Sequence, residues 1–295
     1  MLPLLLLLAF AAAGCGQGST GGSGKLQVVA AENFWGSIAQ QLGGEHVVVR
    51  SIITNPASDP HDYEPTSADA RTMAGARVAI VNGIGYDTWA TKLLDANPTS
   101  GRVTLGVGDL LGLKAGDNPH QWYSPPSVQR VIDRITADYE KADPKHGAYY
   151  EQRRRFFEAK SLARYTRLIA QIKKRYAGTP VGASESIFAA LAPELGLRLL
   201  TPKKFLDAIS EGTEPTPAVK TEVDRQIADR RIKVWVYNSQ NATPDVQRLN
   251  SAARAGGIPI ATVTETLTPA GASFEVWQAR ELASLQAALA KAGGR

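Results

Sequence analysis

The chain has 295 residues, which is too long for one typical core and suits two lobes or two domains. Hydrophobic residues make up 43% of it and charged residues 21%, so the composition is globular and excludes an intrinsically disordered chain. The formal net charge is +5, but the basic runs at 153–155 and 173–175 are interleaved with apolar residues at helical spacing. We interpret these runs as solvated helix faces and expect no nucleic-acid partner.

The first segment is an apolar run, Leu2–Ala13, that is too short to span a bilayer as a mature helix. It is typical of a signal peptide, which we place at residues 1–14. Small residues then precede Cys15, the only cysteine of the sequence, in a pattern that resembles the lipobox of bacterial lipoproteins. The resemblance implies cleavage before Cys15, acylation of its sulfur, and an extracytoplasmic protein anchored by lipid to the bacterial cell membrane. The alternative is an ordinary secretory signal followed by a free cysteine.

Residues 15–24 comprise this cysteine and a tether of glycine, serine, threonine and glutamine, none of which forms a core. A flexible tether of this length reaches about 15–18 Å on average. We therefore expect the folded body to begin at residue 25 and to move just off the membrane. A single cysteine also excludes an intrachain disulfide and a thiolate metal cluster.

From residue 25 onwards, short apolar strands alternate with amphipathic helices. The predicted strands are Leu26–Ala31, Val47–Ile53, Val78–Asn82, Val103–Val107, Pro180–Ala183, Arg198–Leu200, Lys233–Tyr237 and Pro259–Val263. Predicted helices include Ser37–Leu42, Tyr86–Ala96, Ala218–Asp229 and Phe274–Ala290. This alternation predicts an α/β fold of βαβ units. The strands form two groups of four, so we expect two lobes, 25–142 and 178–295, each a mostly four-stranded parallel sheet flanked by helices.

Residues 143–177 are predicted to form a single long helix that joins the two lobes. Asp143 can cap it, Pro144 suits its first position, and basic residues suit its last turn. Apolar residues recur three or four apart on one face, namely Leu162, Tyr165, Ile169, Ile172 and Tyr176. At 1.5 Å per residue the helix would be about 50 Å long and could join the lobes rigidly. Two shorter helices broken near Gly147 or Arg153 are the alternative.

Two of the four histidines lie in matching contexts. His61 and His120 each directly follow a proline and precede an aromatic residue by two positions. Their loops leave the carboxyl ends of predicted strands, where open α/β sheets place ligand sites. Because proline fixes φ, such loops can hold an imidazole in the fixed geometry that a metal site requires. The other two histidines, His46 and His146, are interpreted as surface residues.

Four segments carry a resemblance to a known family: Asp59–Pro65, Asn118–Trp122, Asn82–Trp89 and Ile209–Pro217. The first two resemble the histidine motifs of the zinc/manganese solute-binding proteins of ABC transporters, whose lobes are joined by one long helix. The others resemble the family's Asn-Gly turn into a helix and its second-lobe segment. The resemblance extends over the whole mature chain. It implies a metal held by four side chains, two from each lobe, and the first two correspond to His61 and His120.

The remaining two metal ligands implied by the resemblance come from the second lobe. The third is His in many zinc binders and Glu in many manganese binders, and it corresponds to Glu185, which follows a strand in a Ser-x-x-x-Phe context. The fourth is an acidic residue after the last strand and corresponds to Glu265, where Asp is more usual. Glu211 and Glu214 are the alternative carboxylates, and we interpret both as loop residues near the lobe interface.

The chemistry of these four side chains agrees with a divalent ion, because two neutral imidazoles and two carboxylates give a net-neutral site. Imidazole suits borderline metals, while carboxylate shifts the preference towards harder ones such as manganese. The sequence offers no sulfur ligand, which argues against Cu(I), and no His-rich loop of the kind common in zinc-binding members. We therefore favour Mn²⁺ as the transported ion, with Zn²⁺ close behind.

The sequence thus predicts a monomeric substrate-binding protein, not an enzyme, that delivers the ion to the membrane permease of an ABC importer. A metal-dependent hydrolase is an alternative, but HExxH and GxSxG motifs are missing from the sequence. A binding protein for an organic solute would need a larger aromatic-lined cleft between widely closing lobes, which a rigid connecting helix disfavours. A surface adhesin that retains the metal site is a further alternative.

Overall fold

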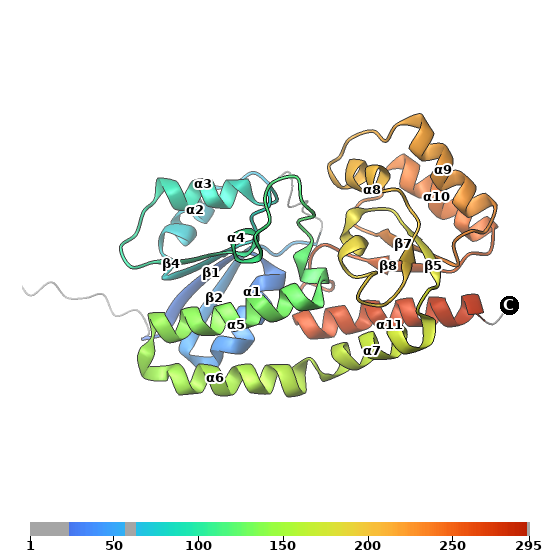
Figure 1. Ribbon diagram of the computed structural model, residues 1–295. Helices are drawn as coiled ribbons and strands as arrows, with labels where there is room; N and C mark the ends of the chain where they lie inside the picture. Colours follow the sequence, from blue (N-terminus) through green and yellow to red (C-terminus); the bar gives the residue numbers. More distant parts are fainter. Residues whose placement is uncertain (1–23, 57–62, 294–295) are drawn as a thin grey trace, which may run out of the picture.

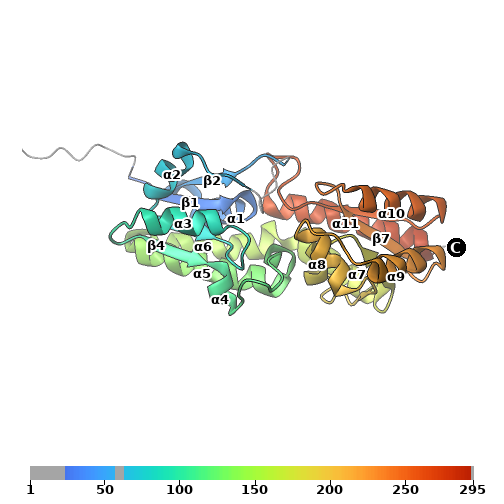
Figure 2. The same ribbon diagram turned by 90° about the horizontal axis from the view of Figure 1, so that it is seen from above.

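The computed structural model describes residues 24–56 and 63–293 (Figure 1). The expected signal peptide, Cys15 and His61 lie outside this part of the chain. The described chain forms two lobes side by side, each built on one sheet, with helices running along one side of both (Figures 1 and 2). Every helix in this part of the chain is too short or too polar to cross a bilayer.

The N-terminal lobe contains a parallel sheet with the strand order β2-β1-β3-β4. Its strands are β1 (Leu26–Glu32), β2 (Val47–Ile53), β3 (Val78–Val81) and β4 (Val103–Gly106). Its helices are α1 (Asn33–Gly43), α2 (Ser67–Ala74), α3 (Thr88–Ala96), α4 (Val107–Leu111) and α5 (Pro125–Ala142). Alternate side chains of β1 pack on opposite faces, Val29 with α2 and α3, and Val28 with α1 and α5. Both faces are therefore covered, as parallel sheets require.

The C-terminal lobe repeats this plan with the strand order β6-β5-β7-β8, again all parallel. Its strands are β5 (Pro180–Ala183), β6 (Arg198–Leu199), β7 (Val234–Asn238) and β8 (Ile260–Val263). Helices α8 (Lys203–Ser210), α9 (Pro217–Ala228) and α10 (Pro244–Ala255) cover one face, where Trp235 of β7 is buried among them. Helix α11 (Phe274–Gly293) covers the other face.

The α/β class and all eight predicted strands are confirmed, with ends that agree or differ by one residue. The first helix starts at Asn33 rather than Ser37, because β1 passes directly into it. Helix α5 adds to the helices singled out from the sequence. The Ser124 side chain accepts a hydrogen bond from Ser127 N, and Pro125 occupies the first turn, so α5 has a regular N-terminus.

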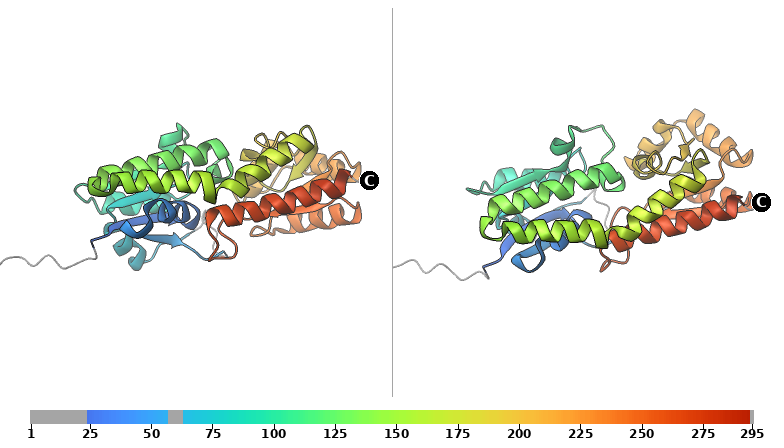
Figure 3. Two further views of the ribbon diagram at one scale, coloured as in Figure 1. Left: turned by 90° about the horizontal axis from the view of Figure 1, so that it is seen from below. Right: turned by 60° about the horizontal axis from the view of Figure 1, so that its bottom comes forward.

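The expected linking helix runs from lobe to lobe, but it is not uniform (Figure 3). A 3₁₀ turn (Pro144–His146) leads into α6 (Gly147–Phe156), a π turn (Phe157–Ser161) follows, and α7 (Ala163–Tyr176) completes the path. The interruption therefore lies after Phe156, and the two sites considered from the sequence, Gly147 and Arg153, are both helical.

Packing against the lobes explains this π turn. The Leu162 amide bonds to the Phe157 carbonyl at 2.9 Å, which closes a five-residue turn, and both side chains are buried. An α-helix would direct residues five apart towards different sides, whereas the wider turn keeps both facing the core. The apolar face continues through Tyr165 and Ile172, and Tyr165 contacts Phe274 at the start of α11. Helices α7 and α11 then run side by side beneath the C-terminal lobe (Figure 3).

Candidate metal centre

The carboxyl ends of the two sheets meet at the lobe junction, where open α/β sheets place ligand sites. Hydrogen bonds cross this junction from Tyr86 to Glu265 and from Asn118 to Ser186. Several polar side chains near these strand ends are almost fully buried: Glu32, Asn82, His120, Ser184, Glu185, Asn238 and Glu265. Burying so many polar groups is costly unless each finds partners, so the contacts of this region show its organisation.

His120 is fully buried and held from one side of its ring. The Asn118 side-chain oxygen lies 3.0 Å from the His120 backbone nitrogen and 2.8 Å from Nδ1, while its amide nitrogen donates to the Ser186 carbonyl at 2.7 Å. These contacts fix the orientation of the Asn118 amide, so the proton of the imidazole is assigned to Nδ1. The other ring nitrogen, Nε2, lies 3.8 Å from Glu265 Oε1 and carries the lone pair that could ligate a metal.

Glu265 follows β8 and is contacted by both lobes. The Tyr86 hydroxyl of the N-terminal lobe donates to its Oε2 at 2.8 Å, and the Asn238 amide of the C-terminal lobe donates to its Oε1 at 3.3 Å. The Gln240 side-chain oxygen accepts from the backbone nitrogens of Glu265 at 2.5 Å and Thr266 at 3.1 Å. The carboxylate is thus held at a defined point of the junction.

Glu185 follows β5 and is fully buried. The Asn238 amide donates to its Oε2 at 2.8 Å, and the Asn241 amide donates to its Oε1. The Asn238 oxygen accepts from the Gln240 backbone nitrogen at 2.9 Å, which orients the amide. One side-chain nitrogen therefore joins the Glu185 and Glu265 carboxylates.

Three of the four predicted ligands, His120, Glu185 and Glu265, belong to this connected buried cluster, and the fourth, His61, lies outside the described residues. Within residues 24–56 and 63–293, no three His, Cys, Asp or Glu side chains lie close enough to hold one ion together. The Asn238 amide lies between the Glu185 and Glu265 carboxylates and donates to both, which keeps them apart.

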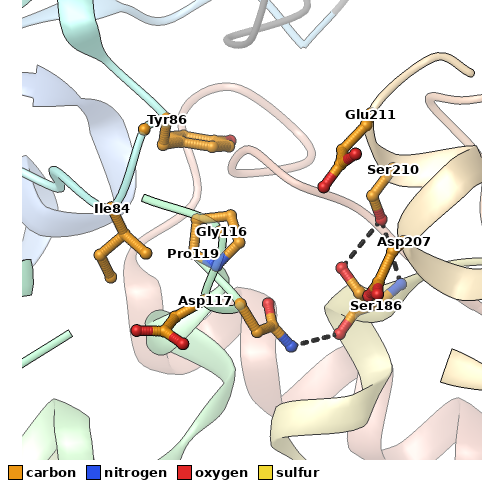
Figure 4. Close-up of a pocket in the computed structure, with 11 residues that line it drawn as sticks. Ile84, Tyr86, Gly116, Asp117, Pro119, Ser186, Asp207, Ser210 and Glu211 are labelled. Atoms are coloured by element: carbon orange, nitrogen blue, oxygen red, sulfur yellow. Dashed lines mark hydrogen bonds between the residues drawn. The ribbon is translucent and has the colours of Figure 1, made fainter. Parts of the chain in front are cut away.

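A cavity of about 150 Å³ lies beside this cluster, between the lobes (Figure 4). Tyr86 and Pro119 of the N-terminal lobe line one side, and Ser210 and Glu211 of the C-terminal lobe line the other. Pro119 directly precedes His120, so the cavity approaches the cluster from the junction. Glu211, one of the alternative carboxylates, belongs to the cavity wall.

The turn after β3 supports the His120 loop from behind. The Asn82 side chain accepts from Trp35 Nε1 at 3.0 Å and donates to the Pro119 carbonyl at 3.0 Å. Residues 83–85 all have positive φ, which two glycines permit, and Asp87 accepts from the backbone nitrogens of Asn82 and Gly83 at 2.7 Å each. This tight turn places Tyr86 against Glu265 and Asn82 against the His120 loop.

Glu32, the last residue of β1, is fully buried near the same turn. Burial, reinforced by the neighbouring carboxyl of Asp87, raises the pKa of Glu32 well above its usual value. Two adjacent buried carboxyls rarely ionise together, so this pair holds a proton at neutral pH.

The remaining candidates from the sequence lie elsewhere. Glu214 is exposed and forms an ion pair with Lys220. His46 and His146 are half-buried and stack on each other at 3.8 Å between ring centroids, with His146 Nδ1 2.7 Å from Asp143. They are a surface pair in the N-terminal lobe that takes no part in the cluster.

Sequence reasoning overlooked the amides that organise the cluster: Asn118, Asn238, Gln240 and Asn241. A signal was present, because the last three directly follow the predicted strand Lys233–Tyr237 at its carboxyl end. Gln240 also donates to the carbonyl of Pro56, in the segment that follows β2. It therefore links the Glu265 turn to the described residues that follow β2.

The sequence matches a family model described as the periplasmic component A of a zinc-uptake complex, over residues 28–288. It is 27% identical over 285 residues to the metal ABC transporter substrate-binding lipoprotein FimA of Streptococcus parasanguinis, which covers 88% of this chain and 86% of that protein. It is 29% identical over 248 residues to the iron-binding protein YfeA of Yersinia pestis, which covers 79% of this chain and 76% of that protein.

A solved structure with a similar fold is the manganese-bound periplasmic metal-binding protein of Candidatus Liberibacter asiaticus. It superposes with a TM-score of 0.75 at 21% identity, and covers 90% of this chain and 100% of that one. At this identity the likeness shows a shared fold.

Proposed function

Because the chain belongs to the family of the periplasmic zinc-uptake component A, we propose that it is the extracytoplasmic substrate-binding protein of an ABC importer and carries a divalent transition metal ion. Relatives are named as substrate-binding lipoproteins of metal or manganese ABC transporters, which supports a role in transport rather than in catalysis. The partners would be a membrane permease and its ATPase.

The ion would be held by His61, His120, Glu185 and Glu265. The observation that carries this proposal is the separation of 3.8 Å between His120 Nε2 and Glu265 Oε1, which approach each other from opposite lobes. Two ligands of one ion at 2.0–2.2 Å lie roughly 3–3.5 Å apart, so a small movement brings both into contact with it. On binding, the ion would replace the Asn238 N–H as the shared partner of the two carboxylates.

Manganese is the favoured cargo, with zinc as the nearest competitor. Two carboxylates can bind through one or both oxygens and raise the coordination number above four, which manganese tolerates better than zinc. Intrinsic affinity still follows the Irving–Williams order, so zinc can bind as tightly. Relatives are named as an iron-binding protein and as a manganese ABC transporter substrate-binding lipoprotein, so we expect more than one divalent ion to bind.

The test is the rise in melting temperature on adding Mn²⁺ or Zn²⁺ to purified protein, because an ion that binds only the folded state stabilises it. His61→Ala and His120→Ala should remove most of this rise, and Glu185→Ala and Glu265→Ala should reduce it strongly. Glu214→Ala, at an exposed carboxylate paired with Lys220, is the matched control. An unchanged metal-induced rise in His120→Ala would contradict the proposal.

We also propose that the lipid anchor is attached to Cys15. Cys15→Ser should release the protein from membranes or block its processing, while the body keeps its metal binding. A wild-type mature protein that carries no lipid would contradict the anchoring, though not the metal site.

A further inference from the structure

A second buried carboxyl, Glu281 of α11, lies directly behind the candidate metal centre. Its Oε2 is 2.5 Å from the Tyr123 hydroxyl, and its Oε1 accepts from the Thr264 hydroxyl and from Trp277 Nε1, both at 2.9 Å. Tyr123 belongs to the short 3₁₀ turn Gln121–Tyr123 that follows His120, and Thr264 directly precedes Glu265. Glu281 therefore contacts the chain segments that carry one proposed ligand from each lobe.

The hydrogen bonds of Tyr123 indicate whether this carboxyl is protonated. The Tyr123 oxygen accepts from the Thr264 backbone nitrogen at 3.3 Å and lies 2.8 Å from the Thr264 carbonyl and 2.5 Å from Glu281. A hydroxyl has one proton, so it cannot donate both to the carbonyl and to a carboxylate. If Glu281 is protonated, it donates to Tyr123, and Tyr123 donates to the Thr264 carbonyl. The Tyr123 hydroxyl, the Thr264 carbonyl and the Glu281 carboxyl then each have a partner.

We propose that Glu281 is a positioning residue of the metal site, whose protonated carboxyl ties the Tyr123 turn after His120 to the Thr264–Glu265 turn. The inference rests on the proposed function, since it assigns a role towards the ion held by His120 and Glu265. Ionisation of Glu281 would break one of the two Tyr123 bonds and loosen the relative placement of these ligands.

The electrostatic surroundings of Glu281 also favour its protonated form. Burial of the carboxyl raises the pKa of Glu281 to about 8. The titratable group that faces it is Tyr123, whose own pKa is raised well above its usual value by burial and by Glu281, and Glu265 acts on Tyr123 from further away. The polar contacts that α1 and α7 make with α11 involve Gln41 with Glu275 and Gln171 with Gln286. The salt bridges of the described chain include none to Glu281.

Two substitutions separate positioning from simple packing. Glu281→Gln keeps a neutral side chain that donates to Tyr123 and accepts from Thr264 and Trp277, whereas Glu281→Leu keeps the volume and loses every hydrogen bond. Affinity for Mn²⁺ is measured by calorimetry from pH 6.5 to 9 for the wild type and both variants, after circular dichroism has established that each is folded.

We expect wild-type affinity to fall about tenfold between pH 7 and 9, as the carboxyl ionises. Glu281→Gln should bind within about threefold of the wild type at pH 7 and should lose this fall, while Glu281→Leu should bind at least about tenfold more weakly throughout. The proposal is overturned if Glu281→Gln shows the wild-type pH profile, or if it weakens binding as much as Glu281→Leu.

A metal-free measurement keeps this inference separate from the proposed function. The folded-state pKa of about 8 lies above the value of about 4.3 for an unfolded glutamate. The free energy of unfolding should therefore fall as the pH rises from the unfolded-state pKa to the folded-state pKa. The melting temperature of the metal-free wild type should therefore fall relative to that of Glu281→Gln from pH 5 to 8. If the protein binds no metal but the melting temperatures still differ in this way, the proposed function alone is rejected. If the melting temperatures of the wild type and Glu281→Gln change with pH in parallel, the protonation of Glu281 is rejected.

Discussion

Asn118→Ala tests whether a residue that holds the proposed ligand His120 controls metal affinity. The Asn118 oxygen holds both the backbone nitrogen and Nδ1 of His120, and its amide nitrogen holds Ser186 in the opposite lobe. Residues that hydrogen-bond to a ligating histidine typically contribute ten- to a hundredfold to metal affinity. We therefore expect Asn118→Ala to weaken Mn²⁺ binding by this factor, or about 1.4–2.7 kcal/mol.

The assay is calorimetric titration with Mn²⁺ at pH 7.5, with Asn97→Ala as control, because Asn97 bonds only locally to the Leu93 carbonyl. Asn118→Asp is a second variant that keeps both acceptor contacts to His120 and loses the donor to Ser186. It should retain most of the affinity and should raise the pKa of the His120 imidazole, since a carboxylate favours the charged ring. Affinity in Asn118→Ala equal to that of the control would refute the assignment of Nε2 as the ligating nitrogen.

Three further predictions concern the same region. Glu185→His should increase the zinc-over-manganese affinity ratio in a competition titration, since imidazole suits zinc better than carboxylate does, and a constant ratio would argue against Glu185 as a ligand. Metal affinity should fall by roughly tenfold for each histidine ligand between pH 7 and 5.5, because protons compete for imidazoles that titrate near ~6.5, and a flat profile would argue against imidazole ligation. Glu32→Gln should raise stability to urea at pH 8 more than at pH 5, by about 1.4 kcal/mol for each unit by which the folded-state pKa of Glu32 lies above 5 within this interval. Equal changes at both values would show that Glu32 ionises in the folded chain.

Much of the fold could be predicted because buried parallel strands are short apolar runs that helices separate. The eight strands were recognisable for this reason, as was the helical path between the lobes. The π turn at Phe157–Ser161 was not, since it results from packing Phe157 and Leu162 on the same core, which no local propensity encodes. Local patterns determine elements, while tertiary contacts decide how a helix bends.

The candidate site was predictable to the extent that its residues are chemically distinctive. Histidines that follow prolines and acidic residues that follow strands are few, so they reduce the number of candidate ligands. The structure brings His120, Glu185 and Glu265 into one buried network. The amides of Asn118 and Asn238 were not predicted, because asparagine caps helices, forms turns and hydrates surfaces as readily as it orients ligands. Their role depends on which partners the fold brings within 3 Å.

The π turn of the linking helix also has a genetic consequence. A π turn contains one residue more than an α-helical turn, so a deletion of one codon between Phe157 and Ser161 would let the segment continue as a regular α-helix. Phe157 and Leu162 would then be four residues apart and would still lie on one face, because four residues complete about 400° of an α-helix. The C-terminal lobe would keep its orientation relative to the N-terminal lobe. The gene can therefore lose one codon in this short segment while its two halves still encode one site.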